Sequence, residues 1–357
     1  MKRFPLAAMM AAFFIFLVLS VSVRQAVLLL VGIGMGATLA GTRFGFTTGW
    51  RQLIEQRDPR GVTGQILLLA LASLAALPLL GQFSELHAAL GPPSVSLLVG
   101  AFLFGLSMQI ADGCGSGTLY KAGLGVPLNM GILPLFALGS FFGSVQVDRW
   151  LALGQIEPVS FPAVFGTGGA LALTLGLLAL ALLVVRAWVG AGQTWIERRW
   201  VWGAVALAVL ATVNLLLAGQ PWGVVYGFGL WVAKISVALG VFDPDANAFW
   251  SQAGHAQRLT LTVLMDLTTI TNIGILAGAL WGSGKGSPSA KPLTAAQWGI
   301  GLAAGFVMGY SSRLAFGCNV GAMLSGISTG SLHGWLWVPL AFAGSVIGVR
   351  VRSHFGF

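Results

Sequence analysis

The stretch GLSMQIADGCGSG, residues 105–117, returns 204 positions later as GYSSRLAFGCNVG, residues 309–321. Each copy holds one cysteine directly after a glycine, Cys114 in the first and Cys318 in the second, and the chain contains no other cysteine. A unit that has been used twice explains this spacing. It predicts a paired thiol site between two related halves of one molecule.

The repeat extends beyond the two cysteines. When they are aligned, a serine and an alanine before each cysteine coincide, and the apolar runs 130–147 and 333–349 follow in the same order. We therefore expect two domains. Residues 1–190 form a first membrane repeat with a linking helix, and residues 191–357 form a second membrane repeat.

The composition of the chain is that of an integral membrane protein. Of its 357 residues 56% are apolar and only 8% are charged, too few to give a soluble globule a polar surface. A helix needs about 20 apolar residues to cross a bilayer core of about 30 Å. The apolar runs that approach this length lie at 5–23, 26–42, 62–80, 95–112, 130–147, 162–188, 200–218, 222–241, 259–281, 298–317 and 333–349.

Several of these runs are short or are interrupted by glycine and proline. Such segments enter the membrane and turn back in many transporters. We expect an all-α membrane protein with two pseudo-symmetric repeats of spanning helices and short re-entrant helices that cross half the bilayer. The first run follows a basic start but precedes no small-x-small cleavage site, so we expect it to be retained as a helix.

Basic residues are distributed unevenly between the loops. They gather in 43–60, in 186–199, in 285–291 and near the C-terminus at Arg350 and Arg352, whereas the loop 81–94 holds no lysine or arginine. By the positive-inside rule the basic segments and the N-terminus face the cytoplasm. The net charge of +9 arises partly from this bias and does not indicate nucleic-acid binding.

Glycine is abundant, with 51 residues, and most of them fit close helix packing. A second role is expected where glycines crowd the thiols. Such breaks expose backbone N–H groups, and these are tolerated at membrane depth where they are buried in protein or line a cavity. Helix N-termini that face each other there would attract an anion. The glycines concerned are Gly113, Gly115, Gly117, Gly317 and Gly321.

Two isolated thiols admit several chemistries. They could attack as thiolates or form a transient disulfide, as in an oxidoreductase or sulfurtransferase, bind a soft metal, or donate weak hydrogen bonds to a passing sulfur atom. The chain shows no metal-ligand spacing among its histidines and no nucleotide motif. We therefore expect no metal, no cofactor and no enzyme, and we favour a permeation path.

Arg313 lies in an apolar run five residues before Cys318, and an intramembrane charge usually faces a cavity or a partner. Its position in the first copy holds Gln109, so the two halves differ chemically. A structural reading, an arginine that reaches to the membrane surface, stays open. Further candidates for the anion path are Asn319, Arg43, Lys121 and Lys234, whereas Trp222, Trp231, Trp335 and Trp337 fit ordinary anchoring at the headgroup level.

The segments IADGCGSGTLY at 110–120 and RLAFGCNVGAMLSGISTG at 313–330 resemble the YeeE/YedE family of bacterial sulfur-compound transporters. The similarity covers most of the chain, including 41–44 and 219–223. The resemblance implies a multi-pass protein of the bacterial inner membrane with an hourglass shape. It also implies that Cys114 and Cys318 contact the terminal sulfur of an anion such as thiosulfate, and that a cytoplasmic TusA-like sulfur-carrier protein is a partner.

One position departs from the family pattern. Many relatives carry a third cysteine in an Arg-Phe-Cys-Phe stretch, where this chain has Gly45. The leading hypothesis is a permease that imports thiosulfate or a related sulfur-containing anion between two thiols. The alternatives are a membrane oxidoreductase or sulfurtransferase that uses both cysteines, and a sensor with the same fold that does not transport.

Overall fold

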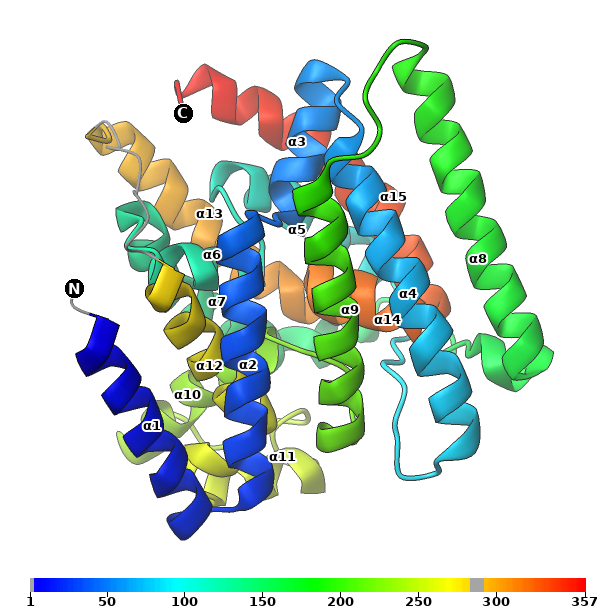
Figure 1. Cartoon of the computed structure of the whole chain (residues 1–357). Helices are drawn as coiled ribbons and strands as arrows, with labels where there is room; N and C mark the ends of the chain where they lie inside the picture. Colours follow the sequence, from blue (N-terminus) through cyan, green and yellow to red (C-terminus); the bar gives the residue numbers. More distant parts are fainter. Residues whose placement is uncertain (1–2, 283–291) are drawn as a thin grey trace.

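The computed structural model describes residues 3–282 and 292–357, which form helices joined by short loops (Figure 1). The basic segment predicted at 285–291 lies outside the described residues. The helices of the N-terminal part are α1 Arg3–Ser20, α2 Val23–Thr42, α3 Phe46–Gln56, α4 Arg60–Gln82, α5 Val95–Ile110, α6 Gly115–Gly123, α7 Pro127–Leu151 and α8 Phe161–Val189. The remaining helices are α9 Arg198–Ala218, α10 Val225–Ala238, α11 Ala253–Thr260, η1 Val263–Met265, α12 Leu267–Gly282, α13 Ala295–Leu314, η2 Asn319–Ser325, α14 Gly326–Ser328 and α15 Leu332–His354.

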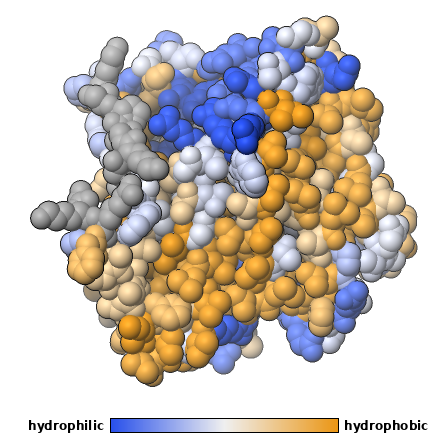
Figure 2. All heavy atoms as spheres, viewed as in Figure 1, coloured by the Kyte–Doolittle hydropathy of each residue, from blue (hydrophilic) through white to orange (hydrophobic). Residues whose placement is uncertain are grey.

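The all-α membrane fold predicted from composition is confirmed. Among the described residues, seven helices are long and apolar enough to cross a bilayer, so the protein is a multi-pass membrane protein. In Figure 2 apolar side chains cover a broad band of the visible face, and hydrophilic side chains gather at the end where α3 and the C-terminus lie.

Most predicted runs match helices to within a few residues, but the run 259–281 is divided. Helix α11 ends at Thr260, and α12 begins only at Leu267. Asp266 stands between them, and its Oδ2 accepts hydrogen bonds from the backbone N–H of Thr269 at 2.7 Å and from its hydroxyl at 2.8 Å. A carboxylate in this position starts a helix, because it satisfies N–H groups that have no intrahelical acceptor.

Helices α5 and α13, which carry the repeated motif, lie side by side and run in opposite directions. The Ser96 hydroxyl near the start of α5 donates to the Leu314 carbonyl at the end of α13, at 2.9 Å. At the other end of the molecule, the C-terminal part of α15 bonds both the end of α5, through Arg352 and the Gln109 carbonyl, and the start of α13, through the Phe355 carbonyl and Gln297. The two motifs therefore enter the centre from opposite faces.

Each of these helices packs closely on the long helix that follows the other motif: α5 on α15 and α13 on α7. The repeated glycine makes both contacts possible. A Cβ on Gly105 would overlap the backbone of Ala341, and a Cβ on Gly309 would overlap the backbone of Phe136. In lipid there is little hydrophobic force between helices, so their association depends on close van der Waals packing. Small residues permit this packing because they let the backbones approach each other.

Basic segments that are far apart in the sequence share one end of the molecule. Helix α3, the connection between α8 and α9, and the C-terminus lie together there, opposite the loop that follows α4 (Figure 1). This grouping is what the positive-inside rule requires of segments on one side of a membrane. Which side that is stays a prediction, as does the division of the chain at residue 190.

Candidate functional site

Each cysteine follows the same strained turn. Asp112 and Phe316, at equivalent repeat positions, have left-handed φ angles of 55° and 56°, a conformation that residues with a side chain seldom adopt. The turns redirect the chain after α5 and α13. Cys114 then caps α6, where its Sγ accepts from the Gly117 N–H at 3.4 Å, and Cys318 caps η2, where its Sγ accepts from the Val320 N–H at 3.4 Å.

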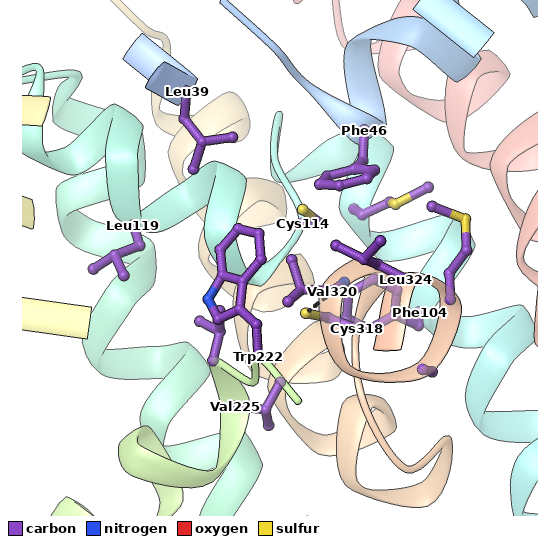
Figure 3. Close-up of a cluster of buried hydrophobic side chains, with 14 of the residues drawn as sticks. Leu39, Phe46, Phe104, Cys114, Leu119, Trp222, Val225, Cys318, Val320 and Leu324 are labelled. Carbon is purple, nitrogen blue, oxygen red and sulfur yellow. Dashed lines mark hydrogen bonds between the residues drawn. The ribbon is translucent and has the colours of Figure 1, made fainter. Parts of the chain in front are cut away.

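The structure brings the two cysteine loops together at the centre. A Cβ built on Gly115, the neighbour of Cys114, would lie 3.3 Å from the Cys318 Sγ. Figure 3 shows both thiols in one buried cluster, with Phe46 and Trp222 beside them. The exposed fractions of Cys114 and Cys318 are 1% and 0%. In this conformation both thiols are closed off from water.

Two of the five crowding glycines are required by close contacts. A Cβ on Gly113 would lie 2.8 Å from the Thr118 nitrogen, and Gly317 combines a φ of 147° with a Cβ position 2.5 Å from the Ala322 nitrogen. At Gly115 a Cβ would make a tight contact of 3.3 Å with the Cys318 Sγ, which a small shift of that side chain would relieve. At Gly117 and Gly321 a Cβ would meet ordinary contacts, at 3.5 Å and 3.9 Å.

A cavity of about 400 Å³ reaches the Cys318 loop from the side of the 81–94 loop, and its lining includes Gly317, Gly321, Phe316 and Arg313. The guanidinium of Arg313 lies 4.8 Å from the ring centre of Phe249 and 5.5 Å from that of Tyr226. No carboxylate of the described residues forms an ion pair with it. The arginine thus faces a cavity with its charge unneutralised, as an anion site requires.

Histidine 255 adds no charge to this cavity at neutral pH. It accepts or donates one hydrogen bond with the Tyr226 hydroxyl at 2.9 Å and stacks on Phe249 at 4.1 Å. Burial, together with the nearby charges of Arg313 and Arg258, lowers the pKa of His255 to about 4. The charged side chains in the lining of the cavity are those of Arg313 and Asp148.

On the other side of the thiols from the Arg313 cavity lies a cluster of charged side chains around Asp112. Two residues before Cys114, the Asp112 carboxylate pairs with Arg51 at 2.8 Å, with Lys121 at 2.7 Å and with Arg352 at 3.6 Å. Lys121, predicted as a candidate for the anion path, is thus bound to a carboxylate, and the two arginines beside it were not predicted. They come from α3 and from the end of α15, and no local pattern connects those helices.

The other candidates are scattered. Asn319 is fully buried beside Cys318, and neither atom of its amide has a partner among the described residues. Gln109 lies on the ionic side, where its amide donates to the Thr47 carbonyl at 3.4 Å. Lys234 donates to the carbonyls of Leu259 and Leu261, so it ties α10 to the segment after α11. Arg43 is exposed at the end of α2.

Two tryptophans predicted as headgroup anchors are core residues instead. Trp222 and Trp337 are exposed by only 1% and 0%. Trp222 precedes α10 and lies next to the thiols in Figure 3, and its carbonyl accepts from Ser325 of η2 at 2.7 Å. Its place in a glycine-rich break, Gly-Gln-Pro-Trp-Gly at 219–223, is the sequence signal that distinguishes it from an anchor at a helix end.

Comparison with known proteins gives a consistent result. A family model described as sulphur transport matches residues 41–347. The chain is 28% identical over 329 residues to the thiosulfate transporter TsuA of Spirochaeta thermophila, covering 86% of this chain and 93% of that protein. It is 23% identical to the Escherichia coli thiosulfate transporter TsuA, covering 91% and 92%. A probable transporter YedE of Salmonella typhimurium is 27% identical over 44% of this chain and 39% of its own length.

Proposed function

The chain belongs to the sulphur-transport family, and from this premise we propose that it imports thiosulfate or a related sulfur-containing anion through a central path between Cys114 and Cys318. The observation that carries the proposal is the approach of the Cys318 sulfur to Gly115, which puts both cysteine loops at one narrow point. As a member of a transporter family the protein is not an enzyme, which removes the oxidoreductase and sulfurtransferase alternatives.

The charges along the route support an anion. Arg313 places a positive charge without an ion pair on the wall of the outer cavity, which Asp148 also lines. Beyond it each thiol lies at the N-terminus of a short helix, where unpaired N–H groups favour negative charge. A protonated thiol is a weak donor that suits a polarizable sulfur atom. Weak contacts let an ion enter and leave, whereas strong ones would trap it.

The closed thiols imply that transport requires movement. The outer cavity ends at Gly317 and Gly321, and Cys114 and Cys318 are sealed from water behind them. The two thiols cap the short elements α6 and η2, which connect the long helices. We infer that this is an occluded conformation and that a shift of these elements opens the centre.

The setting of the transporter follows from the same proposal. It would lie in the bacterial inner membrane, with the ionic end at Asp112 in the cytoplasm and the Arg313 cavity outside. Two repeats divided near residue 190 would form the two halves of an hourglass. A TusA-like carrier protein would receive the imported sulfur at the cytoplasmic end.

Replacement of each thiol tests the proposal. In cells that lack other thiosulfate uptake, we expect Cys114→Ala and Cys318→Ala each to reduce uptake of labelled thiosulfate about tenfold, the worth of one lost contact of about 1.4 kcal/mol. Ser73→Ala is the matched control, because this serine is buried on α4 away from the thiols and bonds only its own helix. Uptake that survives both cysteine changes would contradict a path that depends on the thiols, whereas a parent protein that supports no uptake would favour the sensor.

A further inference from the structure

The ion cluster at the inner end holds more positive charge than its own carboxylate neutralises. Around Asp112 lie three cationic side chains, Arg51, Lys121 and Arg352, which we call the inner cradle. Three positive charges and one negative charge leave a net charge of +2. Glu55 is the next carboxylate near Arg352, but it is exposed and forms no ion pair with it.

One donor of the inner cradle is unused. The Nη2 of Arg51 binds Asp112, while its Nη1 is buried and has no partner among the described residues. A buried guanidinium N–H without an acceptor is costly, so its presence points to a ligand. The four side chains keep exposed fractions of 14% to 24%, and water and small ions can therefore reach them.

We propose that the inner cradle is a second anion-binding site, which takes a small divalent oxyanion after it has passed the thiols. This rests on the proposed function for the source of the anion, but the site itself needs no thiol. A dianion would neutralise the net charge of +2, and the unpartnered Nη1 of Arg51 would donate to one of its oxygens. Thiosulfate and sulfate share this chemistry.

Asp112 is the competing ligand that keeps this binding weak. Its carboxylate already occupies the cations at 2.7 and 2.8 Å, so an incoming anion must share them with it. Asp112 also sits in the left-handed turn two residues before Cys114, so a change in its contacts acts directly on the thiol loop. The carboxylate thus favours release of the anion into the cytoplasm, as a conducting site requires.

Equilibrium binding of labelled sulfate to the purified full chain tests this site. Sulfate has the charge and oxygens of the ligand but no terminal sulfur for the thiols. We expect Asp112→Asn to tighten sulfate binding about tenfold, which corresponds to about 1.4 kcal/mol. The repulsion between the Asp112 carboxylate and an anion about 4 Å from it in a partly exposed site is at least this large, and the substitution removes it. Arg51→Gln and Arg352→Gln should each weaken it by a similar factor.

The matched control is Asp58→Asn. The Asp58 carboxylate forms an ion pair of 2.7 Å with Arg60 and belongs neither to the inner cradle nor to the thiol loops. It should leave sulfate binding unchanged. Equal effects of both Asp→Asn changes, or no effect of Asp112→Asn, would overturn the inference. If Asp112→Asn does not fold, unchanged binding by Arg352→Gln overturns it instead. The same measurements in the Cys114→Ser, Cys318→Ser protein separate this inference from the proposed path, because the inner cradle should still bind sulfate there.

Discussion

At the scale of single residues, the sequence pointed to the two thiols and the glycines beside them as candidate site residues, because both copies of the repeat place a cysteine directly after a glycine. It could not predict which glycines are indispensable. A Cβ on Gly115 would crowd the sulfur of Cys318, a residue 203 positions away, whereas a Cβ on Gly321 in the same motif would make only an ordinary contact. The burial of Trp222 was missed for the same reason, since its neighbours come from other parts of the chain.

Gly115→Ala tests the contact between the two cysteine loops. The added Cβ would lie 3.3 Å from the Cys318 Sγ and 3.4 Å from the Phe136 ring, so it would crowd the point where the two loops meet and Cys318 would have to shift. We expect uptake to be lost and the free energy of unfolding to fall by about 1–3 kcal/mol. Gly299→Ala is the control, because it meets no atom within 4 Å and should keep its melting temperature and uptake.

His255→Gln tests the protonation state in the outer cavity. The pKa of His255 is about 4 in the folded protein and about 6.5 when unfolded, so the unfolded chain binds the proton first on acidification. The stability that neutral His255 contributes is fully present above pH about 6.5 and is lost as the pH falls towards 4. Between pH 7 and 4.5 the melting temperature of the variant should fall less than that of the parent; an identical fall would contradict the assignment.

At the scale of elements, most long apolar runs were predicted to within a few residues, because length and hydropathy are enough to define a spanning helix. Short elements were not. Helices α3, α6 and η2 depend on turns and caps whose partners are distant, and the run 259–281 hid a helix start at Asp266. Hydropathy reports how well a segment suits lipid or a protein core, and it does not report where N–H groups find their acceptors.

Asp266→Ala tests that helix start. The carboxylate caps α12 through Thr269 and is 3.8 Å from Arg258, so its removal leaves two N-terminal donors without an acceptor. We expect a loss of about 1–2 kcal/mol in the free energy of unfolding. Asp266→Asn, whose side-chain oxygen can still accept, should restore most of it. Equal losses in both variants would show that charge, not capping, sets the stability.

At the scale of the whole molecule, the two copies of one motif have acquired different surroundings. Arg313 and aromatic rings stand before Cys318, and an ion cluster stands before Cys114. The repeat in the sequence predicted that the thiols are related, and it also showed, through Gln109 and Arg313, that the halves differ. The opposite direction of α5 and α13 could not be predicted, because a repeat in sequence has no orientation in the membrane.

The crossings of α5 with α15 and of α13 with α7 hold this arrangement together. Gly105→Val and Gly309→Val would each place a side chain into a facing backbone, at Ala341 and Phe136. We expect both to destabilise the fold by about 3 kcal/mol or more and to reduce the yield of monodisperse protein in detergent. Gly299→Val on α13 is the control. A normal yield of both variants would show that these crossings are not essential.

The most direct test of the central claim is the selectivity of the purified protein in liposomes, measured as the ratio of labelled thiosulfate flux to labelled sulfate flux. If the Cys114 and Cys318 thiols meet the terminal sulfur of the anion, Cys318→Ala will lower thiosulfate flux and leave sulfate flux unchanged, so that the ratio falls about tenfold. A ratio that stays constant while both fluxes change together would contradict the claim.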